Sequence, residues 1–165
     1  MVSFFLDGSA LAKRFVPETG SALVDFVFES VPEHRVYLLN VGAAEVVSVL
    51  VRKKNAGNLS VADFSQAIID LENEVIQSAA KRILSFDNEI VSDALAHIIA
   101  HSVNATDAIV VRVAIDVAQH LRNQGDDLVL VASDQRLLRA AQAEGLVTFN
   151  PEIEDQAVLA ALVGP

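Results

Sequence analysis

The clearest strand and helix of the sequence follow one another in LVLVASDQRLLRAAQAEGL, residues 128–146. Residues 128–132 are five consecutive apolar residues, a pattern typical of a strand buried on both faces of a parallel sheet. Residues 135–145 carry apolar side chains at helical spacing and end at Gly145, a common helix stop. Asp134 lies two residues beyond the predicted strand, so this segment predicts a strand, an acid and a helix in that order.

The N-terminus repeats this order. VSFFL, residues 2–6, is a short apolar run that ends at Asp7. Residues 9–16 then carry apolar side chains at helical spacing, and Ser9 stands where an N-cap is expected. A second carboxylate is therefore predicted at the carboxyl end of a strand.

Further strands and helices alternate along the rest of the chain. Additional strands are predicted at 35–39, 82–86 and 147–149. Additional helices are predicted at 21–30, 42–54, 60–77, 89–102 and 106–122. Glu45 falls in the first turn of the helix from Gly42, and Asp107 lies at the start of the helix from Thr106. This alternation predicts an α/β fold, in which helices cover both faces of a mostly parallel sheet of about five strands.

The composition fits a single domain of this class. The chain has 165 residues, and 52% of them are hydrophobic although there is no Trp and one Met. Such a core must be built from Val, Leu, Ile and Ala, which suits parallel strands covered by helices. We expect residues 1–150 to form the domain and residues 151–165 to form a helical tail that packs on it.

Charge and targeting patterns narrow the classes of function. Apolar runs are interrupted well before the roughly 20 residues of a membrane span, and no basic and then apolar leader begins the chain. Because there is no cysteine, any metal must be held by oxygen or imidazole, and a cytoplasmic location without a membrane partner is expected. The net charge of −10 argues against a broad basic face for nucleic acid.

Four carboxylates stand where they can meet. Asp7 and Asp134 follow strands, and Glu45 and Asp107 lie near helix starts. Ligands of parallel sheets bind at the carboxyl ends of the strands. Clustered carboxylates repel one another, so such a cluster favours a hard divalent cation, Mg²⁺ or Mn²⁺. Taken singly, each acid also fits an ordinary turn or helix start.

Four segments resemble the signature segments of PIN domains, particularly those of VapC-like toxins. They are FLDGSALAKRFVPETGS, VGAAEVVSVLVR, TDAIVVRVA and LVLVASDQRLLRAAQAEGL, and the trailing VTFNP resembles the usual end of the domain. The resemblance covers nearly the whole chain in the same order. Gly8 stands where the family often has Thr or Ser.

This resemblance implies a three-layer α/β/α fold and a metal-dependent endoribonuclease. Its catalytic metal ligands would be Asp7, Glu45, Asp107 and Asp134. Ser9 and Ser133 would be hydroxyls that orient these carboxylates. The metal would activate water for attack on an RNA phosphodiester, leaving a 5′-phosphate. The resemblance also implies a homodimer and a role as the toxin of a toxin–antitoxin pair.

Cationic side chains provide candidates for substrate binding. Lys13 and Arg14 are the best placed because they closely follow the first acid, and Arg112 is a further candidate. Arg52, Lys53 and Lys54 could also line a path for the RNA backbone, although solvated helix faces are the more ordinary explanation for all of these residues.

Other functions fit the residues less well. A phosphatase using Asp7 as nucleophile would be expected to have a second Asp two residues on, where Ser9 stands. A regulatory module that keeps the fold without turnover agrees with the acidic charge. His97 and His101 lie four residues apart and could share a zinc ion, but the sequence indicates no third ligand, so they are interpreted as ordinary histidines.

Overall fold

The computed structural model describes residues 1–164. They form one parallel sheet with the strand order β3-β2-β1-β4-β5. The strands are β1 Val2–Leu6, β2 Val36–Leu39, β3 Arg82–Leu84, β4 Asp127–Val131 and β5 Val147–Phe149. The predicted α/β class and mostly parallel sheet are confirmed.

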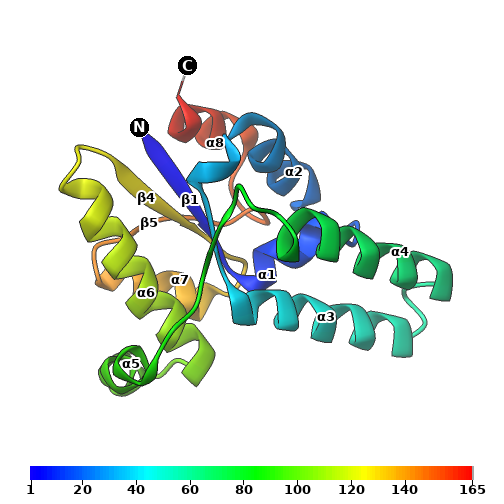
Figure 1. Ribbon diagram of the computed structural model, residues 1–165, viewed down its shortest axis with the longest axis horizontal. Coiled ribbons are helices and arrows are strands. Elements are labelled where there is room, and N and C mark those ends of the chain that lie inside the picture. Colours follow the sequence, from blue (N-terminus) through cyan, green and yellow to red (C-terminus); the bar gives the residue numbers. More distant parts are fainter. Residues whose placement is uncertain (165) are drawn as a thin grey trace.

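Eight α-helices cover this sheet within the described residues. They are α1 Gly8–Leu11, α2 Ser21–Ser30, α3 Asn40–Asn55, α4 Val61–Leu71, α5 Asn88–His101, α6 Ala105–Arg122, α7 Gln135–Ala143 and α8 Gln156–Val163. In Figure 1, α5 and α6 lie on one side of the strands, and α3 and α4 lie on the other. The molecule therefore has the three layers expected of an α/β/α fold.

The alternation of strand side chains builds a core on each face. In β1, Phe4 and Leu6 pack into the cluster beneath α1 to α4, whereas Phe5 packs into the cluster beneath α5 to α7. Successive side chains of a strand point to opposite faces, so a continuous apolar run supplies both cores.

The register of the two central strands places their carboxyl ends together. Leu6 of β1 pairs with Leu38 of β2 and with Val131 of β4. The Asp7 amide continues the ladder by donating to the Val131 carbonyl at 3.0 Å. The residues that follow β1 and β4 consequently emerge at one edge of the sheet.

Several predicted boundaries were wrong. The helix expected at 9–16 with Ser9 as its cap begins at Gly8, because the Asp7 side chain accepts from the Ser9 amide, and it tightens into a 3₁₀ turn, η1 Ala12–Arg14. A 3₁₀ turn, η2 Glu33–Arg35, precedes β2, and the helix expected at 60–77 ends in a π-helical turn, η3 Glu72–Ile76. Glu45 lies in the second turn of α3 because that helix begins at Asn40.

The segment after β5 folds back over the sheet. Leu159 of α8 is fully buried in the same cluster as Phe4, and α8 lies against α2 (Figure 1). Within residues 1–164, no single helix has the length and apolarity needed to cross a membrane, although the bent pair α5 and α6 together passes that test.

Candidate metal and nuclease site

Asp7 is held rigidly at the end of β1. It caps α1, and its Oδ2 accepts hydrogen bonds from the Ser9 amide at 3.0 Å and the Ser9 hydroxyl at 2.7 Å. The residue is only 7% exposed. Burial raises the pKa of Asp7, and it outweighs the hydrogen bonds from Ser9, which favour the charged form.

Asp107 enters the cluster from the first turn of α6. Asn104 caps α6 by accepting the Asp107 amide at 2.8 Å, which presents the Asp107 carboxylate from the first turn. Its Oδ2 is buried and has no hydrogen-bond partner in residues 1–164. Burial, together with the charges of Asp7 and Asp134, raises the pKa of Asp107 to about 6.

Glu45 reaches the cluster from α3. A Cβ atom placed on Gly8 would lie 2.4 Å from Glu45 Oε2 and 2.8 Å from Glu45 Cβ, so the helix packs directly over the Gly8 backbone. Burial and the charges of Asp7 and Asp107 raise the pKa of Glu45 to about 7. The glycine thus permits an approach that a larger residue would obstruct.

Asp134 caps α7, and its Oδ1 accepts the Arg136 amide at 2.7 Å. Its charge contributes to the raised pKa values of Asp7 and Asp107, which places it within electrostatic range of both. The structure therefore brings together the four acids singled out by the sequence, although they span 128 positions of the chain from Asp7 to Asp134.

These acids surround a cavity of about 300 Å³. Its lining comprises Asp7, Gly8, Ser9, Glu45, Ser48, Val49, Arg52, Asp107 and Asp134. Four carboxylates face one cation there, and burial together with their mutual repulsion raises the pKa of Asp7, Glu45 and Asp107. The donor set and the unpartnered Asp107 oxygen fit a hard divalent cation such as Mg²⁺ or Mn²⁺.

The family model of the PIN domain matches residues 4–143. This chain belongs to the PIN domain family. The match includes all four acids of the cavity, and the resemblance noted in the sequence is confirmed at the level of the family. Among curated proteins, none matches this chain.

Solved structures share the fold of this PIN domain. VapC20 of Mycobacterium tuberculosis, described as a toxin cleaving the sarcin-ricin loop, superposes with a TM-score of 0.61 at 18% identity, covering 93% of this chain and 100% of that one. PAE2754 of Pyrobaculum aerophilum superposes with a TM-score of 0.60 at 16% identity, covering 98% of this chain and 95% of that one. A chain of a toxin–antitoxin complex from Klebsiella pneumoniae superposes with a TM-score of 0.53 at 16% identity, covering 90% of this chain and 98% of that one. At these identities the likeness establishes the fold.

Two serines link the strand ends of the PIN domain. Besides donating to Asp7, the Ser9 hydroxyl accepts the Ser133 amide at 2.9 Å, which ties the loop after β4 to the loop after β1. The Ser133 hydroxyl is buried without a partner among the described residues. Ser9 therefore orients Asp7 directly, whereas Ser133 supports Ser9 through its backbone amide.

The predicted substrate cations do not line the cavity of the PIN domain. Lys13 is 2% exposed and bonds Glu18 at 2.9 Å and Glu152 at 2.6 Å. Arg14 is paired with Asp25 and Glu74, and Arg112 with Asp93 and Asp116. These interactions occupy the three cations away from the acids, so the structure does not support their assignment to substrate binding.

Arg52 is the cation that the structure brings to this cavity. It lies seven residues after Glu45 on α3, and Ser48 and Val49 of the same helix also line the cavity. Positions three, four and seven apart share one helix face. This spacing was the signal in the sequence that would have ranked Arg52 above Lys13.

Proposed function

We propose that this PIN domain is a Mg²⁺- or Mn²⁺-dependent endoribonuclease. The observation that carries the proposal is the convergence of four carboxylates on one cavity, one of them with a buried oxygen that has no partner in residues 1–164. Such a cluster is costly unless a cation neutralises it. PIN domains are generally nucleases, and VapC20 is described as cleaving an RNA loop.

In this proposal the four acids would hold the cation and Arg52 would contact the RNA. Asp7, held by Ser9, and Asp107 would hold the cation, and Glu45 and Asp134 would complete the site. When bound, the cation supplies the positive charge that stabilises the phosphodiester and lowers the pKa of the attacking water. Arg52, at the wall of the cavity, would pair with a backbone phosphate of the RNA.

The test is RNA cleavage under controlled metal conditions. We expect cleavage with Mg²⁺ or Mn²⁺, none in EDTA, no rescue by Ca²⁺, and products with 5′-phosphates. Asp7→Asn should lose activity by at least a hundredfold, whereas Asp93→Asn, which removes an exposed carboxylate outside the cavity, should remain active. Full cleavage in EDTA would overturn the metal mechanism.

We further propose a role as the toxin of a toxin–antitoxin pair, acting as a homodimer. The Klebsiella pneumoniae structure of the same fold is a toxin–antitoxin complex. Four acids face a single cation, Arg52, in this cavity, so an antitoxin peptide is expected to place a further Arg or Lys among the acids and to displace the metal. Expression of the chain alone should slow growth, and light scattering should give twice the mass of one chain.

A binding module without turnover is the second candidate. The net charge of −10 and the single cation in the lining of the cavity disfavour RNA affinity and thus favour this alternative. Metal titration followed by the cleavage assay separates the two functions. A nuclease gains thermal stability from Mn²⁺ and cleaves RNA, whereas a module of this kind cleaves none at any metal concentration.

A further inference from the structure

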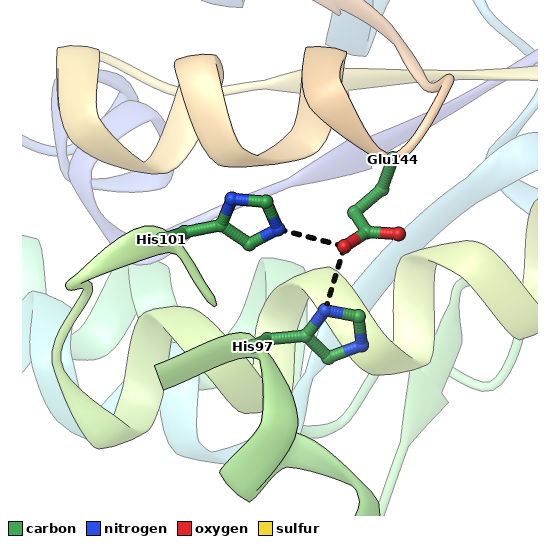
Figure 2. A group of neighbouring side chains, drawn as sticks. All are labelled: His97, His101 and Glu144. Atoms are coloured by element: carbon green, nitrogen blue, oxygen red, sulfur yellow. Dashed lines mark hydrogen bonds and ion pairs between the residues drawn. The ribbon is translucent and has the colours of Figure 1, made fainter. Parts of the chain in front are cut away.

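Two histidines and a glutamate form a second polar cluster, distinct from the acidic cavity. His97 and His101 lie one turn apart on α5, with nearly parallel rings whose centroids are 6.1 Å apart. Figure 2 shows both rings directed at the carboxylate of Glu144, which caps the C-terminal end of α7. A third possible ligand, which the sequence did not indicate, therefore lies beside the two histidines at the end of α7.

A single carboxylate oxygen of Glu144 lies within hydrogen-bond distance of both histidine rings. His97 Nδ1 lies 3.1 Å and His101 Nε2 2.7 Å from the same Oε1 of Glu144, and the ligand atoms of the three residues lie within 4.8 Å of one another. Zinc bonds of about 2.0–2.1 Å place tetrahedral ligand atoms about 3.3 Å apart. The two nitrogen–oxygen distances, 3.1 and 2.7 Å, are already close to this spacing.

The two histidines of this cluster are partly buried, whereas Glu144 is exposed. The side chains of His97 and His101 are 13% and 18% exposed, and α5 and α7 pack into the same apolar core. Holding ligands on rigid helices lowers the entropy lost on binding. These features distinguish the cluster from histidines on an open surface.

We propose that His97, His101 and Glu144 bind one Zn²⁺ ion that clamps α5 to α7. Two imidazoles and one carboxylate are a recognised zinc ligand set, whereas Mg²⁺ prefers the oxygen ligands of the acidic cavity. A fourth position is left for water or an anion. Arg136 and Arg139, which line a cavity of about 280 Å³ with His101, favour an anion there.

The clamp has a structural consequence for the acidic cavity. Helix α7 carries Glu144 at its C-terminal end and Asp134 at its N-terminal end. Zinc bound at one end fixes the helix whose other end presents a carboxylate to the cavity. This inference does not depend on nuclease activity, and its test needs none.

Equilibrium dialysis against Zn²⁺ provides the test, with metal analysis of three variants. Asp7→Asn/Asp107→Asn removes two acids of the cavity. In that background, His97→Gln/His101→Gln also removes two proposed zinc ligands, and His120→Gln removes a histidine of α6 that contacts Gln124. We expect one tightly bound Zn²⁺ to persist in the first and third variants and to be lost from the second. Zinc retained by the second variant, or absent from the first, overturns the proposal.

A second variant keeps the test valid if the double histidine variant fails to fold. Glu144→Gln keeps the shape of the side chain, and we expect it to weaken Zn²⁺ binding at least tenfold. In the background without the two acids, Zn²⁺ should raise the melting temperature by several degrees, and Glu144→Gln should abolish this rise. An unchanged affinity and an unchanged rise would exclude Glu144 from the site and overturn the clamp.

Discussion

Gly8 determines how closely Glu45 can approach Asp7. The family often has Thr or Ser at this position, yet a Cβ here would lie 2.4 Å from the Glu45 carboxylate and 2.8 Å from its Cβ. The second contact involves the base of the side chain, which cannot swing away without moving α3. The absence of a side chain at this position and the inward placement of Glu45 are therefore two parts of one packing arrangement.

Gly8→Ala should weaken Mn²⁺ binding by at least tenfold and lower the free energy of unfolding by about 1–2 kcal/mol, because Glu45 must shift. Gly42→Ala is the matched control. Its added Cβ meets only the Gly8 backbone nitrogen, at 3.8 Å, an ordinary contact. Calorimetric Mn²⁺ titration and chemical denaturation measure both effects, and equal Mn²⁺ affinity in Gly8→Ala and wild type would contradict this account.

Asp107→Asn removes one charge from the cluster while preserving shape. In EDTA we expect this variant to be as stable as wild type or more stable, by on the order of 1 kcal/mol, because repulsion is relieved. Its activity should be lost, and Mn²⁺ should raise its melting temperature much less than that of wild type. If Asp107 instead only favoured its helix start, the variant would be slightly destabilised and Mn²⁺ would affect both proteins alike.

At the scale of elements, one face of α3 forms a wall of the acidic cavity. Glu45, Ser48, Val49 and Arg52 share this face. By contrast, Lys13 in the turn after α1 connects two loops, because its partners Glu18 and Glu152 precede α2 and follow β5. Burial alone would lower the pKa of Lys13, but its hydrogen bonds to Glu152 and Glu18 raise it. Arg52 therefore faces the acidic cavity, whereas Lys13 links two loops away from it.

Arg52→Ala should raise the KM for RNA about fivefold to tenfold with little change in stability, and it should reduce the salt dependence of binding by about one phosphate contact. Arg82→Ala, an exposed arginine on β3, is the control and should leave KM unchanged. Binding measured across salt concentrations decides the matter. An identical salt slope in Arg52→Ala and wild type would remove Arg52 from the RNA path.

Lys13→Met should have the opposite effect to Arg52→Ala: it should lower stability and leave RNA cleavage nearly unchanged. Removing a buried cation leaves two carboxylates without their partner, and we expect a loss of about 2–3 kcal/mol in the free energy of unfolding. Activity per folded molecule should stay close to that of wild type because Lys13 does not line the cavity. Urea denaturation and cleavage assays at low temperature test both statements, and a raised KM in Lys13→Met would restore it as a substrate residue.

For the whole molecule, the acidic cavity makes stability depend on pH. The pKa of Glu45 is raised from 4.5 to about 7, so the folded state binds a proton more tightly than the unfolded state. The resulting stabilisation is fully present below pH 4.5 and is lost as pH rises through 7. Asp107, raised from 3.8 to about 6, acts in the same direction.

In EDTA the protein should therefore be less stable at pH 8 than at pH 5, with Glu45 contributing on the order of 1 kcal/mol of the difference. Glu45→Gln removes the titrating group and should show a smaller difference. Saturating Mn²⁺ should reverse the trend, because protons and metal compete for the same oxygens. Urea melts at the two pH values measure these differences, and an equal pH dependence in Glu45→Gln would contradict the assignment.

The sequence by itself determined the layers of this protein and the acids at its sheet edge. Apolar runs such as residues 128–132 predict buried parallel strands, and the acids that follow β1 and β4 predict a common edge. These inferences succeeded because strand formation and the spacing of Asp7 and Asp134 from their strands are local properties. The family likewise followed from the order of short segments.

Only the tertiary structure decided which side chains reach one another. Lys13 is buried by Glu152, 139 positions away, and His101 meets Glu144, 43 positions away. Neither contact has a periodic signal, because each depends on how separate elements pack across the core. The partners of a long polar side chain are set by that packing. The sequence therefore indicated which acids meet at the sheet edge but could not show which cations or histidines lie beside other side chains.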